Sequence, residues 1–179
     1  GHLSLEIAVR IVCGISEALV AVHAHDIIHR DIKPDNIFLV EGREQYSDWV
    51  RLMDFGIARV MSPGATQVTS DGSRLGSMPW IAPEQIELDG PELDLRGDIY
   101  GTCSVLYEAL TGQPPFGTDS VAKIVARKTK SETPPSMRTI RPEIPEALDS
   151  VVLCALARDR NLRYATMTEF AQALQDAMS

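Results

Sequence analysis

Cysteine is scarce in this sequence, whose 179 residues include only Cys13, Cys103 and Cys154. The number is odd, the spacings are wide and no Cys-x-x-Cys pair occurs, so the sequence predicts neither a disulfide framework nor a cysteine metal site. We interpret the three residues as reduced, buried cysteines, which is the usual state of cysteine in a cytoplasmic protein. Cytoplasmic localisation is therefore expected.

Long apolar runs and an excess of basic residues are also missing. No apolar run approaches the roughly 18 residues that a membrane-spanning helix needs, and no basic N-terminus leads into a short apolar stretch as in a signal peptide. The 17 lysines and arginines are outnumbered by 25 aspartates and glutamates, which gives a formal net charge of -8. Because nucleic-acid-binding proteins need a positive field to capture phosphate, this balance argues against nucleic acid as a partner.

The remaining composition favours one mostly helical domain, with 44% hydrophobic and 23% charged residues. Apolar residues recur at helical spacing over 7–22, behind Ser4 as a suitable helix cap. Residues 99–110 are apolar on nearly every face, which predicts a helix buried all round. Further helices are expected at 120–128, 148–156 and 166–177.

Two short apolar runs, 37–40 and 50–53, flank a polar stretch and predict a small β-hairpin. Residues 61–77 are rich in Ser, Thr and Gly without periodicity, which is typical of a long exposed loop. The basic run from Arg127 to Lys130 is expected to be a solvated helix end. His2, His23 and His25 are expected at the surface or at helix ends.

The densest polar segment is His29-Arg30-Asp31-Ile32-Lys33-Pro34-Asp35-Asn36, and Asp54-Phe55-Gly56 follows the second strand. A hairpin brings the end of one strand beside the start of its partner, so Asn36 and Asp54 are expected at the same edge. An amide oxygen and a carboxylate that converge there suit Mg²⁺, which takes oxygen ligands and shares them with phosphates. Asp31 would lie within reach of the same group, and the arrangement indicates phosphoryl transfer.

In this order the motifs resemble the large lobe of a protein kinase. Residues 29–36 resemble the catalytic loop, residues 54–56 the triplet that opens the activation segment, and Ala82-Pro83-Glu84 the motif that closes it. Lys33 is typical of Ser/Thr kinases, and the sequence around these motifs resembles the bacterial, Hanks-type members. The resemblance covers essentially the whole chain and implies a mainly α fold of the α+β family, a helical bundle with a small β-hairpin at the catalytic edge.

Roles for the site residues are implied by this resemblance. Asp31 would orient the substrate hydroxyl and accept its proton, and Lys33 would neutralise charge on the phosphoryl group. Asn36 and Asp54 would hold the magnesium ions that bridge the ATP phosphates, and Phe38 would pack under the adenine ring. The implied cofactors are ATP and Mg²⁺, and the implied partner is a protein substrate that presents Ser or Thr.

Other residues are implied to regulate or support the site. Arg30 is expected to pair with a phosphorylated residue of the activation loop, with Thr66 and Thr69 as the favoured candidates. Ser77 stands where Thr is more usual in the family, and its hydroxyl is expected to bond Asp31 and Lys33. The implied structural residues are Glu84 and Arg163 as a buried ion pair, Asp98 as an acceptor for the catalytic-loop backbone, and His29 stacked on Phe55.

One departure from the family is large. The glycine-rich phosphate loop, the strand lysine and the helix glutamate of the small lobe are not found, and the first lysine of the chain is Lys33. Residues 1–179 are therefore expected to be the C-terminal lobe alone, as a fragment or a truncated product. The isolated chain is expected to be inactive, with the ATP-clamping lobe and any sensor domains supplied by the parent.

Two alternatives remain at the level of sequence. The first is a kinase-like scaffold or binding module without catalysis, against which Asp31, Lys33, Asn36 and Asp54 are all present. The second is a small-molecule phosphotransferase of related fold. The Ala82-Pro83-Glu84 motif and the long loop before it count against this second alternative.

Overall fold

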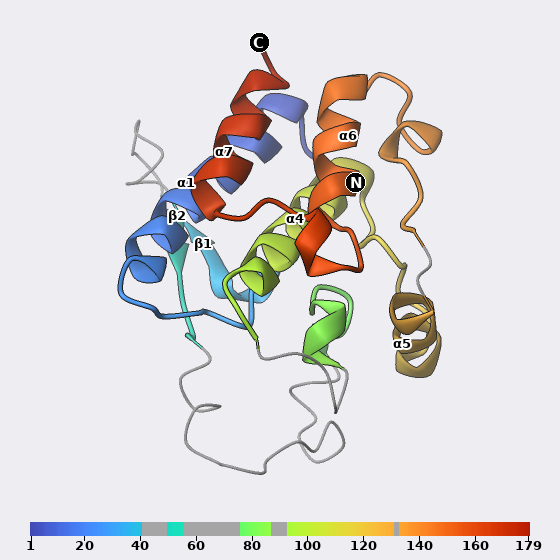
Figure 1. The fold of residues 1–179 in the computed structure, drawn as a ribbon. Helices are drawn as coiled ribbons and strands as arrows, with labels where there is room; N and C mark the ends of the chain where they lie inside the picture. The colour runs from blue at the N-terminus through green and yellow to red at the C-terminus, as the bar shows by residue number, and fades with distance from the viewer. Residues whose placement is uncertain (41–49, 56–75, 87–92, 131–132) are drawn as a thin grey trace.

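In the computed structural model, which describes residues 1–40, 50–55, 76–86, 93–130 and 133–179, helix α4 (Arg96–Thr111) lies at the centre (Figure 1). Every residue from Gly97 to Tyr107 is buried, as predicted for a helix without a polar face. Helix α4 is packed against α1 (Leu5–His23), α6 (Glu146–Ala155) and α7 (Met167–Asp176). The predicted mainly helical fold is confirmed.

The core that these helices share consists of aliphatic and aromatic side chains with almost no exposure, among them Ile15, Leu19, Leu106, Leu148 and Phe170. Each such side chain contributes about 1.5–3 kcal/mol through the apolar surface that it removes from water. Among the described residues, no helix has both the length and the apolar character needed to cross a bilayer.

Helix α1 begins where the sequence predicted. The Oγ of Ser4 accepts a hydrogen bond from the backbone N–H of Ile7 at 3.2 Å, which satisfies one of the amide groups left open at a helix start. Ile11 and Ile15 are buried in the predicted stripe, but Ile7 is 43% exposed. The predicted apolar spacing is present, but the covered part of the helix begins directly after Ile7, with the buried residues Ala8 and Val9.

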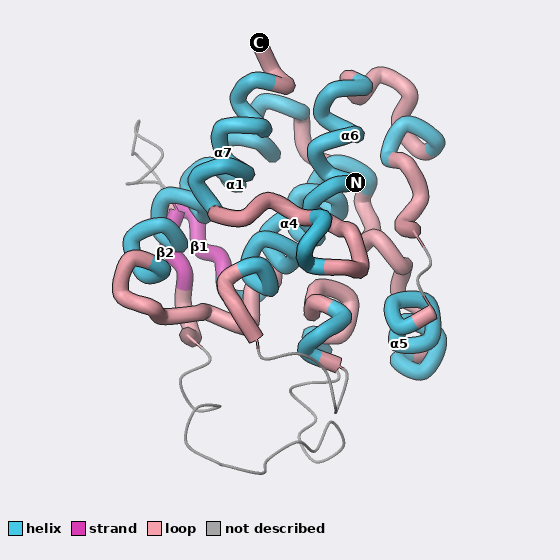
Figure 2. The backbone as a smooth tube through the Cα atoms, in the orientation of Figure 1, coloured by secondary structure: helices cyan, strands magenta, loops and turns pink. Residues whose placement is uncertain are grey.

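The predicted hairpin is present. Strands β1 (Ile37–Leu39) and β2 (Val50–Leu52) are antiparallel, and Phe38 is opposite Arg51 in their register (Figure 2). Val50 is buried in the shared core, and the hairpin packs along α1. Phe38 is 53% exposed, and its partner Arg51 on the same face is exposed as well. Because successive strand residues point to opposite faces, the hairpin has one face on the bundle, with Val50, and one open face, with Phe38. Leu39 is on the Val50 face and is 47% exposed.

Helix α5 (Val121–Thr129) lies apart from the bundle, beside the 3-10 turn η3 (Pro83–Gln85) (Figure 1). Its apolar side covers a small second cluster of buried side chains that is separate from the main core. The other short turns of the described chain are η1 (Pro34–Asn36), η4 (Met137–Thr139) and η5 (Arg160–Leu162).

The basic run at the end of α5 contradicts the sequence-based expectation. Arg127 is partly covered and Lys128 is only 1% exposed, so Lys128 does not belong to a solvated helix end. Its ammonium group lies among backbone carbonyls of the segment before η3, 47–50 residues away in the chain. Local charge patterning could not reveal this, because the burial depends on a distant segment.

Gly101 allows helix α4 to approach the loop after α1 closely. A Cβ at Gly101 would lie 3.0 Å from the Cβ of Ile32, which cannot move without its backbone. We expect Gly101→Ala to lower the free energy of unfolding by about 1–3 kcal/mol through overpacking. Gly97→Ala is the matched control, because a Cβ there meets only ordinary contacts of 3.6 Å or more. Urea unfolding of both variants tests this, and equal stabilities would contradict it.

Candidate active site

The loop between α1 and η1 is hydrogen-bonded to a side chain in the first turn of α4. The carboxylate of Asp98, 1% exposed, accepts the backbone N–H groups of His29 and Arg30, both at 2.8 Å. A third partner, the Nε2 of His23, lies 2.8 Å from the same carboxylate. One buried side chain thus fixes the start of the loop.

His23 was not singled out by the sequence. It lies at the end of α1, as expected, but its side chain is only 8% exposed because it contacts Asp98. Its position in the sequence could have indicated this contact. His23 is the last residue of α1 and closely precedes the loop whose backbone Asp98 was expected to bind. His23 is thus a third hydrogen-bond partner of the Asp98 carboxylate, besides the two backbone N–H groups.

Two residues at the site have left-handed backbone conformations. Arg30 has φ 69° and Asp54 has φ 55°. Such a conformation costs a non-glycine residue on the order of 1–3 kcal/mol and persists where the surroundings hold it. Around Arg30, Asp98 binds the backbone N–H and the side chain of Gln85 donates to the carbonyl at 2.9 Å. The strain at Arg30 is therefore balanced by contacts from α4 and η3.

Asp31, Lys33, Asn36 and Ser77 form one connected polar cluster. The Nζ of Lys33 lies 3.2 Å from Oδ2 of Asp31 and donates to Oγ of Ser77 at 2.9 Å. The side-chain amide of Asn36 donates to the Asp31 carbonyl at 2.8 Å and to Oδ2 of Asp31 at 3.2 Å. The other carboxylate oxygen, Oδ1 of Asp31, is buried and has no hydrogen-bond partner among the described residues.

The hairpin sets the position of Asp54 relative to Asn36. The N–H of Met53 donates to the Asn36 carbonyl at 2.9 Å, which places Asp54 one residue beyond the Asn36 level. The side chain of Asp54 is exposed. No direct contact joins the Asp54 and Asn36 side chains in the described structure. The backbone therefore brings the two residues to one edge of the hairpin, as the sequence predicted.

His29 and Phe55 pack behind the site. Their ring centroids are 4.5 Å apart. Burial lowers the pKa of His29, against the opposing effects of Asp98 and other neighbours, so the imidazole is neutral. Its Nε2 lies 3.1 Å from the Met53 carbonyl, and its Nδ1 accepts from the Asp31 N–H at 3.4 Å. These partners select the tautomer with the proton on Nε2.

The oxygen atoms at the site fit a magnesium–phosphate group. Since the amide nitrogen of Asn36 is committed to Asp31, the amide oxygen is left for another partner. The exposed carboxylate of Asp54 supplies a second oxygen, and Mg²⁺ typically takes one or two such protein ligands and fills the rest with water and phosphate oxygens. The Oδ1 of Asp31, which has no hydrogen-bond partner among the described residues, adds a further acceptor.

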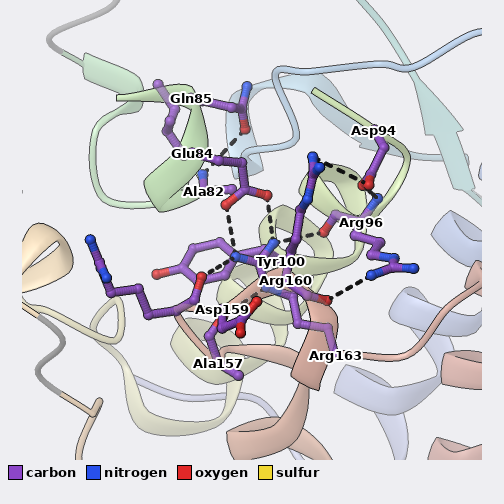
Figure 3. Close-up of polar contacts among 12 residues, drawn as sticks. Ala82, Glu84, Gln85, Asp94, Arg96, Tyr100, Ala157, Asp159, Arg160 and Arg163 are labelled. Carbon is purple, nitrogen blue, oxygen red and sulfur yellow. Dashed lines mark hydrogen bonds and ion pairs between the residues drawn. The ribbon is translucent and has the colours of Figure 1, made fainter. Parts of the chain in front are cut away.

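A buried ion pair joins η3 to the segment after η5 (Figure 3). The guanidinium of Arg163 donates to both carboxylate oxygens of Glu84, at 2.7 and 2.8 Å. Its remaining N–H groups donate to the carbonyls of Ala157, Arg96 and Arg158, and it lies 4.9 Å from the Tyr100 ring centroid. All five N–H donors of Arg163 are thus used, and the buried Glu84–Arg163 ion pair expected from the sequence is present.

The residues expected to regulate the site fall partly outside the described chain. Thr66 and Thr69 lie outside the described residues, and so does Gly56 of the triplet at 54–56. Arg30 is described and lies beside Asp31. Phe38 is described and exposed on β1.

Comparison with known proteins places these features in a family. The family model described as "Protein kinase domain" matches residues 1–177. The chain is 40% identical over 171 residues to "Probable serine/threonine-protein kinase PknB" of Bifidobacterium longum, covering 95% of this chain and 24% of that protein. It is 38% identical over 180 residues to the serine/threonine-protein kinase PknD of Mycobacterium tuberculosis, covering 100% of this chain and 26% of that protein.

A solved structure agrees with these matches. The crystal structure of a mutant PknI kinase domain from Mycobacterium tuberculosis has a TM-score of 0.69 and 27% identity, covering 100% of this chain and 57% of that one. The chain spans about a quarter of the length of the curated relatives it matches, at 24% and 26%. Because the family model extends over nearly the whole chain, the chain belongs to the protein kinase domain family.

Proposed function

We propose that this chain provides the catalytic residues of a Ser/Thr protein kinase, which transfers the γ-phosphoryl group of ATP to Ser or Thr hydroxyls of a protein substrate. The observation that carries the proposal is the state of Asp31. One of its carboxylate oxygens is held by Lys33 and Asn36, and the other is buried with no hydrogen-bond partner in the described part of the chain. A hydroxyl that donated to this second oxygen would be oriented and ready to lose its proton.

The neighbouring residues divide the remaining work. The ammonium of Lys33, between Asp31 and Ser77, would offset negative charge on the phosphoryl group as it transfers. Asn36 and Asp54 would hold Mg²⁺, which when bound neutralises and orients the ATP phosphates. The exposed ring of Phe38 would lie under the adenine. Ser77 would keep Lys33 in place from the substrate side.

We also propose that residues 1–179 form the C-terminal lobe of the catalytic domain and that the ATP-clamping elements lie elsewhere in the parent protein. Two observations support this. The chain covers 57% of the PknI kinase domain structure. Phe38 and Met53 leave an apolar surface on the side of the hairpin opposite to buried Val50, with exposures of 53% and 50%. On this proposal the isolated chain transfers phosphate negligibly.

Regulation of the proposed kinase would involve Arg30. Its neighbour Asp31 is the proposed base, and its strained backbone is fixed by Asp98 and Gln85. A phosphate on Thr66 or Thr69 would pair with the Arg30 guanidinium beside Asp31. Phosphopeptide mapping of the active full-length protein tests this, and a loop without phosphate would remove the idea.

The proposed activity is tested with the full-length protein, radiolabelled ATP and a generic protein substrate. We expect label on Ser or Thr, loss of transfer when Mg²⁺ is chelated, and no label on a peptide whose only hydroxyl is Tyr. A folded full-length protein that labels no Ser/Thr substrate would contradict the proposal and favour a scaffold. Label found only on small molecules would favour a phosphotransferase of another class.

A further inference from the structure

Helix α5 contains a lysine that is more deeply buried than any other lysine of the described chain. Lys128 is 1% exposed, and its Nζ donates to three backbone carbonyls: Met78 at 2.9 Å, Pro79 at 2.9 Å and Ile81 at 2.6 Å. The ring centroids of Tyr100 and Phe116 lie 5.2 and 5.9 Å from the same nitrogen. The ammonium is therefore surrounded by carbonyls and aromatic faces.

This arrangement pairs every N–H donor of a protonated lysine. An ammonium has three N–H donors, and the three carbonyls accept all of them. A neutral amine would have only two donors and would leave one buried carbonyl without its partner. Burial lowers the pKa of Lys128 to about 7, with Arg163 acting in the same direction and Glu84 against it. Burial thus disfavours the charged form of Lys128, whereas the three hydrogen bonds to carbonyls favour it.

The carbonyls belong to the segment that borders the proposed catalytic cluster. Residues 77–84 run from Ser77, which accepts from Lys33, to Glu84, which pairs with Arg163. Within the segment, the N–H groups of Trp80 and Ile81 donate to the Ser77 carbonyl at 3.1 and 3.2 Å and close a turn. Lys128 binds the residues directly after Ser77. Three cations therefore hold this segment at its start, middle and end.

The three cations connect different parts of the fold to the segment. Lys33 lies in the proposed catalytic loop, Arg163 follows η5, and Lys128 comes from α5, which lies apart from the bundle (Figure 1). Met78 and Ile81 also form the apolar cluster against which Val121 and Val125 of α5 pack. A shift of α5 would therefore move residues 78–81 and, through the closed turn, Ser77.

From this geometry we propose that Lys128 is a positioning residue for the protein substrate: it holds residues 78–81 so that a protein hydroxyl is presented correctly to Asp31. The inference rests on the proposed kinase function and adds a second level of support, since Lys128 touches neither the proposed metal ligands nor the phosphoryl site. Its loss should impair use of the protein substrate far more than use of ATP.

The test compares Lys128→Met with Lys123→Met in the full-length protein. Methionine keeps the apolar stem of Lys128 and removes the three donors. Lys123 is on the same helix, but its side chain is 67% exposed, and its Nζ lies 4.0 Å from the Asp119 carboxylate. We expect Lys128→Met to lower kcat/KM for the protein substrate by about 10- to 100-fold through misplacement of the acceptor. The KM for ATP and the slow hydrolysis of ATP without substrate should stay within about twofold of wild type.

A second measurement separates failure of this inference from failure of the proposed function. Hydrogen exchange of the amides in residues 77–82 reports the tether without any activity, and we expect faster exchange in Lys128→Met than in Lys123→Met. Unchanged exchange, or equal losses for ATP and the protein substrate, would overturn the inference even if the wild type is an active kinase. If Lys128→Met does not fold, Lys128→Gln is measured in the same way, because it removes the charge and leaves at most two of the three donors. Unchanged exchange and unchanged use of the protein substrate in Lys128→Gln would overturn the inference.

Discussion

Asparagine in place of Asp31 is expected to lower kcat for phosphate transfer by about 10²- to 10⁴-fold, the usual contribution of a positioned acid–base group. Asparagine has nearly the shape of aspartate, and its amide oxygen can still accept from Lys33 and Asn36 on the Oδ2 side. Its NH₂ group would then stand where the unpartnered Oδ1 of Asp31 lies. A donor at that position cannot accept the proton of a substrate hydroxyl.

Steady-state kinetics of the full-length protein measure this effect. Because Asp31 is not a proposed ligand of the metal or of ATP, the KM for ATP should change little in Asp31→Asn. The matched control is Asp35→Asn, which makes the same chemical change on an exposed carboxylate of the same loop. Its activity should stay within about twofold of wild type. Transfer that is undiminished in Asp31→Asn would remove Asp31 from the mechanism.

Much of this site was predictable because its parts are local in sequence. The run from His29 to Asn36 and the triplet at Asp54 lie on two sides of one hairpin, and antiparallel pairing alone brings their ends together. Helix α4 was predictable for a similar reason, since an apolar pattern on all faces has no other stable placement. The start of α1 at Ser4 follows from the chemistry of a helix cap.

Other features depend on segments that are distant in sequence. Glu84 and Arg163 are separated by 79 residues, and only the family resemblance indicated their pairing. Lys128 was assigned to a solvated helix end because no local pattern shows that carbonyls 47–50 residues away surround it. The left-handed backbone at Arg30 and Asp54 was also not predictable, since neither residue type requires it. At Arg30, contacts from α4 and η3 hold the backbone, and at Lys128 the carbonyls of Met78, Pro79 and Ile81 surround the ammonium.

The most destabilising single change that we expect is Arg163→Ala, with a loss of about 3–5 kcal/mol in the free energy of unfolding. Arg163 is fully covered and its partner Glu84 nearly so, with side-chain exposures of 0% and 6%. Alanine would leave the Glu84 carboxylate buried without its cation, and three backbone carbonyls would lose a donor as well. Urea unfolding followed by circular dichroism measures the loss as a lower midpoint at an unchanged slope.

Two further variants test whether the unpaired Glu84 carboxylate causes the loss of stability in Arg163→Ala. Arg138→Ala removes an exposed ion pair, with side-chain exposures of 44% and 84% at 3.5 Å from Glu146, and should cost no more than about 1 kcal/mol. In the double variant Glu84→Gln with Arg163→Met, no charge is left unpaired, so it should be more stable than Arg163→Ala. A double variant that is no more stable than Arg163→Ala would assign the cost to lost packing over Tyr100 and lost carbonyl bonds, with the Glu84 charge contributing little.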